Sequence, residues 1–201
     1  MDKEARNIIE QSKALFMQRG FRSVTMDDIA QNLKISKKTI YKYFADKGSL
    51  VSACVIDHLT HMQSSISAGI SNQENAIDEM MKISNCLTEF RKTVQPIIFF
   101  ELEKYFPSSF KLIKDHRENF VKQIIIKNIE RGKAEGIYRD NVDPNFMAAL
   151  YMSATSFLIE SGLFLSQDFT INPLDQFFEY HLRGISSIKG IELLNASKST
   201  Q

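Results

Sequence analysis

The chain has 201 residues, 43% of them hydrophobic, so it is long enough to bury a core and to form one or two domains. No apolar run approaches the ~20 residues that a membrane-spanning helix needs, and we expect a soluble, cytoplasmic protein. The net charge of +1 is divided unevenly, because residues 1–47 carry ten basic and six acidic side chains and the remainder has a net charge of −3. A basic head on an acidic body is typical of a DNA reader joined to a module with another task.

The first predicted helix runs from Asp2 to Arg19. Its apolar residues recur at helical intervals and give it one apolar face. Gly20 directly after it is a typical helix stop, and Phe21 is placed to fold back on the last turn. We expect this helix to complete a three-helix domain with the segment that follows.

The segment Val24–Lys47 predicts two short helices joined by a tight turn. Thr25 is placed to cap the first helix, and Asp28 three residues later resembles the acidic end of a capping box. Ser36 repeats this pattern for the second helix, which leaves only Leu33–Ile35 for the turn. This arrangement is a helix-turn-helix.

The second of these helices leaves basic and hydroxyl side chains exposed. Lysines supply charge for phosphates and donors for guanine edges, and Thr and Tyr hydroxyls reach phosphate oxygens. The exposed set is Lys37, Lys38, Thr39, Lys42 and Tyr43. A solvated face of an ordinary helical domain is the alternative, but polar groups on the outward helix alone favour DNA binding.

These residues resemble the DNA-binding signature of the tetracycline-repressor (TetR) family of bacterial regulators. The match runs through Thr25, Asp28-Ile29-Ala30, Ile35-Ser36, Thr39-Ile40-Tyr41, Tyr43-Phe44, Lys47 and Leu50. The resemblance implies DNA contacts by Thr25, Ser36, Lys37, Lys38, Thr39, Tyr41, Lys42, Tyr43 and Lys47. Lys34 stands where the family usually has glycine in the turn, so we expect a left-handed backbone there at a cost of roughly 1 kcal/mol. Lys42 replaces what is often an aromatic residue or histidine.

The body of the chain is predicted to be helical throughout. Expected helices cover residues 47–68, 75–93, a short element at 97–100, residues 110–135, a helix from 144 to about 165, and a final helix from 173 that includes Ile188. Gly136 is the expected stop of the fourth of these, while Asp143 and Asn172 are expected caps before prolines. The tail from Asn195 onward is expected to be frayed.

The last two helices predict a homodimer. The helix from Pro144 is almost uncharged, and a helix that is apolar all round is buried on more than one side. Pairing with the same helices of a second chain would bury it; an internal core helix in a monomer is the alternative. The predicted interface residues are Ala149, Ser153, Ser156, Leu174, Phe177, Phe178, His181 and Ile185.

Phenylalanine and methionine in the body predict a ligand pocket. Twelve of the fifteen phenylalanines lie outside the first fifty residues, and Phe and Met line adaptable apolar pockets. For each residue singly, filling the core is an equally good interpretation. The predicted pocket consists of Met80, Leu87, Phe90, Phe99, Phe100, Phe120, Ile124, Tyr151 and Phe157.

Other chemistry finds little support in the sequence. His58 and His61 could begin a metal site, but no third ligand is indicated. No phosphate-binding loop, nucleophile elbow or other catalytic set is present, so we expect neither an enzyme nor a cofactor. Cys54 and Cys86 form no CxxC pair, which favours buried free thiols, with a redox sensor as the alternative.

The sequence therefore predicts an all-α protein with a helix-turn-helix DNA-binding domain at residues 1–47 and a ligand-binding and dimerisation domain at 48–201. The TetR resemblance implies a ligand-responsive transcriptional regulator, most simply a repressor, that binds palindromic double-stranded DNA as a homodimer and releases it when a small apolar or amphipathic effector binds. The alternative is a helical protein–protein adaptor whose basic head meets an acidic partner.

Overall fold

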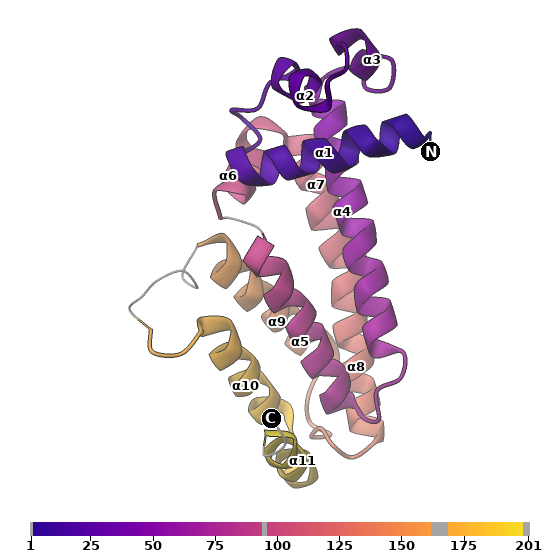
Figure 1. The fold of residues 1–201 in the computed structure, drawn as a ribbon. Coiled ribbons are helices and arrows are strands. Elements are labelled where there is room, and N and C mark those ends of the chain that lie inside the picture. The colour runs from indigo at the N-terminus through magenta and orange to yellow at the C-terminus, as the bar shows by residue number, and fades with distance from the viewer. Residues whose placement is uncertain (1, 94–95, 162–168, 199–201) are drawn as a thin grey trace. The chain divides into compact units, whose positions relative to one another are not determined.

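A computed structural model describes residues 2–93, 96–161 and 169–198 (Figure 1). Within these ranges the chain is helical, without a β-strand, and Tyr138 and Ser186 form an isolated β-bridge. The helices form two compact units. We call Met1–Met62 with Lys92–His116 the head unit, and Gln63–Arg91 with Arg117–Gln201 the body unit. The predicted all-α fold is confirmed, whereas the domain boundary after residue 47 stays a prediction.

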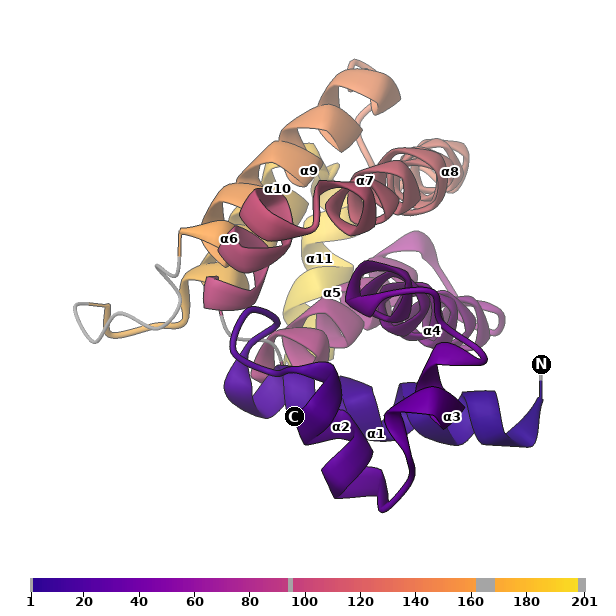
Figure 2. The same cartoon turned by 90° about the horizontal axis from the view of Figure 1, so that it is seen from above.

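The head unit is built on the three N-terminal helices. These are α1 (Lys3–Arg19), α2 (Met26–Leu33) and α3 (Lys37–Tyr41), followed by α4 (Lys47–Ile70) as far as Met62, α6 (Pro96–Tyr105) and α7 (Pro107–His116). Helix α2 contacts both α1 and α3, and Figure 2 shows these three helices together at one end of the head unit. Its fully buried side chains include Ile8, Phe16, Phe21, Ile29, Ile40 and Leu50.

Helix α1 begins and ends for local reasons. Asp2 caps it by accepting a hydrogen bond from the Glu4 N–H, and Gly20 ends it at a φ of 84°. That φ is one that side-chain-bearing residues avoid. Phe21 then folds back so that its ring stacks on Phe16 with 4.8 Å between centroids, as predicted.

Helices α6 and α7 are tied into the head unit by contacts across long sequence separations. The Glu101 carboxylate accepts a hydrogen bond of 3.1 Å from the Arg22 N–H. The Phe106 ring lies 6.2 Å from that of Phe21, and the Ser52 and Ser109 hydroxyls are 2.8 Å apart. The stretch after Pro96, predicted as an element of four residues, is a full helix that packs beside the loop after α1.

The body unit contains α5 (Ala76–Thr93) as far as Arg91, η1 (Arg117–Val121), α8 (Lys122–Ala134), α9 (Pro144–Glu160), α10 (Pro173–Ile185) and α11 (Ile188–Lys198). Helix α9 contacts both α8 and α10. The predicted caps Asp143 and Asn172 are confirmed: Asp143 accepts from the Phe146 N–H at 2.7 Å, and Asn172 from the Leu174 N–H at 3.0 Å. Gly136 follows α8 at a φ of 68°, as expected of a helix stop.

The predicted single helix 110–135 is wrong in two respects. The helix begins at Pro107, and it is interrupted by the π-helical turn η1 between α7 and α8. The Arg117 side chain at the start of η1 donates 3.0 Å to the Met152 carbonyl and pairs with Glu160 at 3.1 Å. A π-turn adds a residue to the helical repeat, a local change that hydrophobic spacing does not reveal. The β-branched run that begins at Val121 is helical, as predicted.

The prediction of one final helix is also wrong, and the predicted frayed tail is wrong as far as Lys198, since residues 199–201 lie outside the described part of the chain. The chain breaks after α10 and restarts as α11, which includes the residues from Asn195 to Lys198. Two hydrogen bonds from Ser187 stabilise the break. Its N–H donates to the Ile137 carbonyl at 2.8 Å, and its hydroxyl donates to the Gly136 carbonyl at 2.7 Å. Ile188 is exposed and does not line the unit.

Candidate functional site

The first helix of the helix-turn-helix is capped as the sequence predicts. The Asp28 N–H donates 3.1 Å to the Thr25 hydroxyl oxygen, while the Thr25 N–H donates 2.7 Å to the Asp28 carboxylate. The Thr25 hydroxyl also donates to the Asp28 carboxylate, and this bond, followed by the one from the Thr25 N–H, lowers the pKa of Asp28. This reciprocal pair satisfies two N–H groups that would otherwise lack partners and fixes where α2 begins.

The turn that follows places Lys34 in the left-handed region, at φ 55° and ψ 38°. Among the described residues it is the only one other than glycine with a positive φ. The Ile35 N–H closes the turn by donating 3.0 Å to the Ala30 carbonyl. The expected left-handed backbone at this position is therefore confirmed.

The second helix, α3, is short and presents its polar side outward. Ser36 caps it by accepting a hydrogen bond of 3.1 Å from the Thr39 N–H, and the hydroxyls of these two residues are 2.9 Å apart. Ile40 points into the core with no exposed surface. Lys37, Lys38, Tyr41 and Lys42 are exposed, whereas Thr39 and Tyr43 are half-buried.

Acidic side chains of the head unit engage part of this polar set. The Lys37 ammonium lies 2.9 Å from the Asp27 carboxylate, and this contact raises the pKa of Lys37. The Tyr43 hydroxyl donates to Glu4 at 2.7 Å and lies 3.0 Å from the Asp2 carboxylate. Sequence reasoning missed these acidic partners, because Glu4 and Tyr43 are 39 positions apart and no local pattern joins them.

Lys47, at the start of α4, is held differently from the lysines of α3. Its ammonium donates 3.1 Å to the Arg22 carbonyl and lies 5.5 Å from the centroid of the Phe106 ring. Partial burial lowers the pKa of Lys47, and nearby Glu101 and Asp28 oppose that effect. The side chain is thus positioned beside the loop that joins α1 and α2.

Comparison with known proteins assigns this geometry to a family. The model of the bacterial regulatory proteins of the tetR family matches residues 8–54, which contain both helices and the turn. The chain is also 25% identical over 193 residues to YvaF, an uncharacterised helix-turn-helix transcriptional regulator of Bacillus subtilis strain 168, with 93% of this chain and 96% of YvaF covered. Residues 8–54 thus carry the DNA-binding region of the tetR family.

Solved structures match the fold of this chain over most of its length. One is a protein of Saccharomonospora viridis described as a transcriptional regulator in complex with choline, with a TM-score of 0.77, 19% identity, and 91% of this chain and 97% of that chain covered. Another is AibR in complex with isovaleryl coenzyme A and operator DNA, with a TM-score of 0.63, 12% identity, and 88% and 96% covered. The chain is thus a DNA-binding transcriptional regulator of the helix-turn-helix class.

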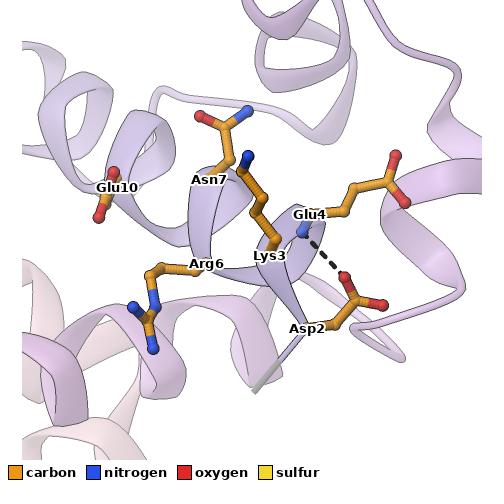
Figure 3. A pocket seen from close by; sticks show the side chains of 6 residues that line it. All are labelled: Asp2, Lys3, Glu4, Arg6, Asn7 and Glu10. Carbon is orange, nitrogen blue, oxygen red and sulfur yellow. Dashed lines mark hydrogen bonds between the residues drawn. The ribbon is translucent and has the colours of Figure 1, made fainter.

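The start of α1 adds an open, charged hollow to the head unit. Figure 3 shows the six side chains that line it, with the hydrogen bond from Glu4 N–H to Asp2 dashed. The hollow has a volume of about 640 Å³ and is lined by Asp2, Lys3, Glu4, Arg6, Asn7 and Glu10. Acids and bases alternate along it, so it presents no uniform charge to a ligand.

The residues predicted for the effector pocket are divided between the two units. Met80 and Tyr151 are buried in the body unit, Phe120 and Ile124 are half-buried there, and Phe157 is exposed. Phe99 and Phe100 belong to α6 in the head unit. The side chains of Leu87 and Phe90 lie outside the described part of the structure. The nine residues therefore stay a prediction rather than a site seen within one unit.

The residues predicted for the dimer interface fall into two groups. Leu174, Phe178, His181 and Ile185 are buried within a single body unit, so in this structure they serve its core. Ala149 and Ser153 are exposed on α9, and Ser156 and Phe177 are half-buried. Apolar side chains that the predicted interface set did not include accompany them on the surface, and these are Phe146, Leu150, Phe157, Phe169, Ile171 and Tyr180.

An apolar hollow of about 530 Å³ lies within this surface, at the end of α9 and the start of α10. Its lining includes Ala154, Phe157, Leu158, Phe177 and Tyr180. Within the described ranges, no group of three or more His, Cys, Asp or Glu side chains is arranged to hold a metal ion. No helix in these ranges is long and apolar enough to cross a membrane.

Proposed function

We propose that the protein is a one-component repressor that binds a palindromic operator as a homodimer and releases it when a small apolar or amphipathic effector binds. The observation that carries the proposal is the head unit: two capped helices, joined at the left-handed Lys34, leave Lys37 and Lys38 exposed beside the hydroxyls of Thr39 and Tyr41. Two such heads related by a two-fold axis would read the two halves of a palindrome.

The exposed apolar surface of α9 and α10 supports the dimer. Phe146, Leu150 and Phe157 follow one another at helical spacing on α9, with the small residues Ala149 and Ser153 between them. Exposed apolar patches of this kind mark interaction surfaces, and small residues allow helices to approach closely. In this proposal the exposed residues, and not the buried Leu174 group, face the second chain.

Ligand response is supported by a solved structure of similar fold. AibR, a structural neighbour, is seen with both isovaleryl coenzyme A and operator DNA. For this chain, the effector must bind the DNA-releasing state more tightly than the DNA-bound state. A tenfold loss of operator affinity needs a coupling of about 1.4 kcal/mol between the two sites.

The proposal is tested by selecting duplexes from a random library with the purified protein and counting the bound chains by sedimentation. We expect a palindromic site occupied by two or four chains. If no sequence is enriched above random DNA, the basic head meets another partner, and the protein–protein adaptor becomes the better interpretation. The selected operator then serves to screen effectors by release of the DNA.

The residues are tested with the double variant Lys37→Ala/Lys38→Ala on the selected operator. It should lose sequence-specific binding while keeping the oligomeric state and melting temperature of the wild-type protein. Lys111→Ala/Lys114→Ala is the matched control, because it removes the same charge from α7 of the same unit. A folded Lys37/Lys38 variant that binds the operator normally would show that these lysines do not read it.

A further inference from the structure

Three buried polar side chains of the body unit come together without hydrogen-bond partners. They are Ser84 on α5, Tyr151 on α9 and His181 on α10, and only 7%, 1% and 3% of their surfaces are exposed. Among the described residues, the Ser84 hydroxyl, the Tyr151 hydroxyl and the His181 Nε2 atom each lack a hydrogen-bond partner within 3.5 Å. A buried polar atom without a partner costs about 1–3 kcal/mol, so three in one place require an explanation.

The three groups are neighbours. The rings of Tyr151 and His181 meet edge to face with 5.2 Å between centroids. Burial raises the pKa of Tyr151, and a hydrogen-bonding contact with the Ser84 hydroxyl, longer than an ordinary hydrogen bond, opposes that rise. Other hydroxyls of α9 find partners locally: Thr155 donates 2.8 Å to the Tyr151 carbonyl, and Ser156 donates 2.7 Å to that of Met152. The Tyr151 hydroxyl therefore differs from these two hydroxyls of the same helix.

We propose that Ser84, Tyr151 and His181 bind the polar end of the effector, and that the effector is a small aromatic molecule with an uncharged hydroxyl or carbonyl oxygen. This proposal rests on the ligand response proposed above and names the class of ligand. Hydroxyls and a neutral imidazole donate and accept hydrogen bonds without supplying charge. They suit an uncharged oxygen better than a carboxylate or an ammonium group.

The surroundings of the trio favour a flat ligand. Phe177 and Phe178 each lie 5.8 Å from Tyr151, and Phe177 also lies 5.8 Å from His181, measured between ring centroids. Aromatic rings at such distances pack edge to face or offset, and a further ring is accommodated in the same way. Burial lowers the pKa of His181 to about 4, so the imidazole is neutral at physiological pH.

The test uses phenol and toluene, which have nearly the same shape but differ by one hydroxyl. Binding to the full chain is followed through the His181 side-chain nitrogen in NMR spectra, with His181→Gln used to assign its signal. We expect wild-type protein to bind phenol at least tenfold more tightly than toluene, and Tyr151→Phe to bind the two equally. Tyr138→Phe is the matched control, because that buried hydroxyl has its own partners, and it should keep the preference for phenol.

Each other outcome is decisive. Equal binding of the two probes to wild-type protein, no binding of either probe, or an unchanged phenol preference in Tyr151→Phe would overturn the proposal. If an ordered water rather than a ligand serves the trio, phenol will show no preference. Operator binding in the presence of phenol is measured separately: a probe that binds the trio but leaves operator affinity unchanged would preserve the polar site and count against its role in ligand response.

A second inference comes from the head unit and stands apart from the first. Tyr43, to which the family resemblance assigns a phosphate contact, already donates its hydroxyl to Glu4 and lies 3.0 Å from the Asp2 carboxylate. Lys42 donates 3.2 Å to the same hydroxyl, and its ammonium lies 4.9 Å from the Tyr43 ring centroid. The acidic start of α1 thus occupies the place of a phosphate beside two expected DNA contacts.

We infer that Asp2 and Glu4 restrain DNA binding by competing with phosphate for Tyr43 and Lys42. A phosphate at the Tyr43 hydroxyl would meet two carboxylates within a few ångströms, and like charges at that distance repel each other. The hydrogen bond to Glu4 raises the pKa of Tyr43, and the contact with Tyr43 raises that of Lys42. Both groups therefore keep their protons. The negative charge of the Asp2 and Glu4 carboxylates is then what opposes a phosphate at this place.

Glu4→Gln tests this inference, because the amide oxygen still accepts a hydrogen bond from Tyr43 while the charge is removed. Glu10→Gln is the matched control: it removes the same charge from an exposed position of the same helix. At low salt we expect Glu4→Gln to bind operator about two- to fivefold more tightly, the range typical of exposed charge pairs, and Glu10→Gln to change affinity less. The difference should shrink as salt screens the charges. Equal effects of the two variants, or weaker binding by Glu4→Gln, would overturn the inference.

Discussion

The body unit contains two fully buried tyrosines whose hydroxyls have opposite environments. The Tyr138 hydroxyl donates to the Asn128 side-chain oxygen and to the Ala76 carbonyl, each at a distance of 3.1 Å. The Tyr151 hydroxyl, on the next helix along the chain, has no hydrogen-bond partner within 3.5 Å among the described residues. One tyrosine hydroxyl thus joins helices through hydrogen bonds, whereas the other is left without an ordinary hydrogen bond.

The Tyr138 centre is complete. Asn128 uses its amide N–H to donate 2.8 Å to the Ala76 carbonyl, and the Ala76 N–H donates 2.9 Å to the Glu135 carboxylate. Arg131 pairs with Glu79 at 2.7 Å and with Glu135 at 2.6 Å. These bonds join the start of α5 to the end of α8, and every buried partner is matched. A matched network stabilises a fold, whereas an unmatched buried group marks strain or a missing ligand.

The largest expected effect on stability comes from Gly132→Ala, because Gly132 lies against the Tyr138 ring. A Cβ atom at Gly132 would lie 2.1 Å from the Tyr138 ring, so the ring would have to move and its hydrogen bonds would be lost. We expect a loss of about 3 kcal/mol or more in the free energy of unfolding, measured by chemical denaturation.

Gly184→Ala on α10 is the control for this substitution. A Cβ there meets nothing within 4 Å, and alanine favours a helix over glycine by about 1 kcal/mol. We therefore expect an unchanged or slightly higher stability. If Gly132→Ala proves as mild as Gly184→Ala, the close approach of the Tyr138 ring is not a constraint on the fold.

The stability of the protein should fall in acid because of the buried His181, which lies beside Tyr151. Burial lowers its pKa from 6.5 to about 4, so the unfolded chain binds a proton there more readily than the folded protein does. Stability from this group is therefore full above pH 6.5 and falls as the pH drops toward 4, by up to about 3 kcal/mol. His181→Gln should flatten that part of the stability–pH curve relative to wild-type protein. Parallel curves for the two proteins would show that His181 is free to take up a proton in the folded state.

The local parts of this molecule could be predicted from the sequence, and its long-range contacts could not. The Thr25–Asp28 capping box, the left-handed Lys34 and the caps before Pro144 and Pro173 depend on residues within a few positions of one another. The DNA-binding helices were predictable for that reason. The bond between Glu101 and Arg22 spans 79 positions, and spacing gives no sign of such a pair.

The same distinction explains the corrections in the body unit. The break between α10 and α11 depends on a carbonyl of Ile137, about fifty residues earlier in the chain. Hydrophobic periodicity predicted a helix that continues through this break, because Ile185 and Ile188 are both apolar and lie at helical spacing. Periodicity also could not tell the buried Leu174 from the exposed Tyr180, since both lie on a helix whose partners are distant in sequence.

Tyr138→Phe should have a smaller effect than Gly132→Ala. It removes one hydroxyl and leaves the Asn128 oxygen without its donor in a buried place, although Asn128 still donates to Ala76. A lost hydrogen bond with an unsatisfied buried acceptor costs about 1–3 kcal/mol. Thermal unfolding of the full chain measures it, and a variant as stable as wild-type protein would mean that water replaces the hydroxyl.

Tyr151→Phe should have the smallest effect, and its sign distinguishes the two centres. Removing a buried hydroxyl that has no partner also removes its desolvation cost, so we expect a change between zero and about 1 kcal/mol in favour of the folded state. The two Tyr→Phe variants remove the same atom from equally buried sites, and size or hydrophobicity therefore cannot explain a difference in sign. Equal destabilisation by both variants would mean that the Tyr151 hydroxyl is already bonded in the ligand-free protein, and the polar end of the effector would then have to bind elsewhere.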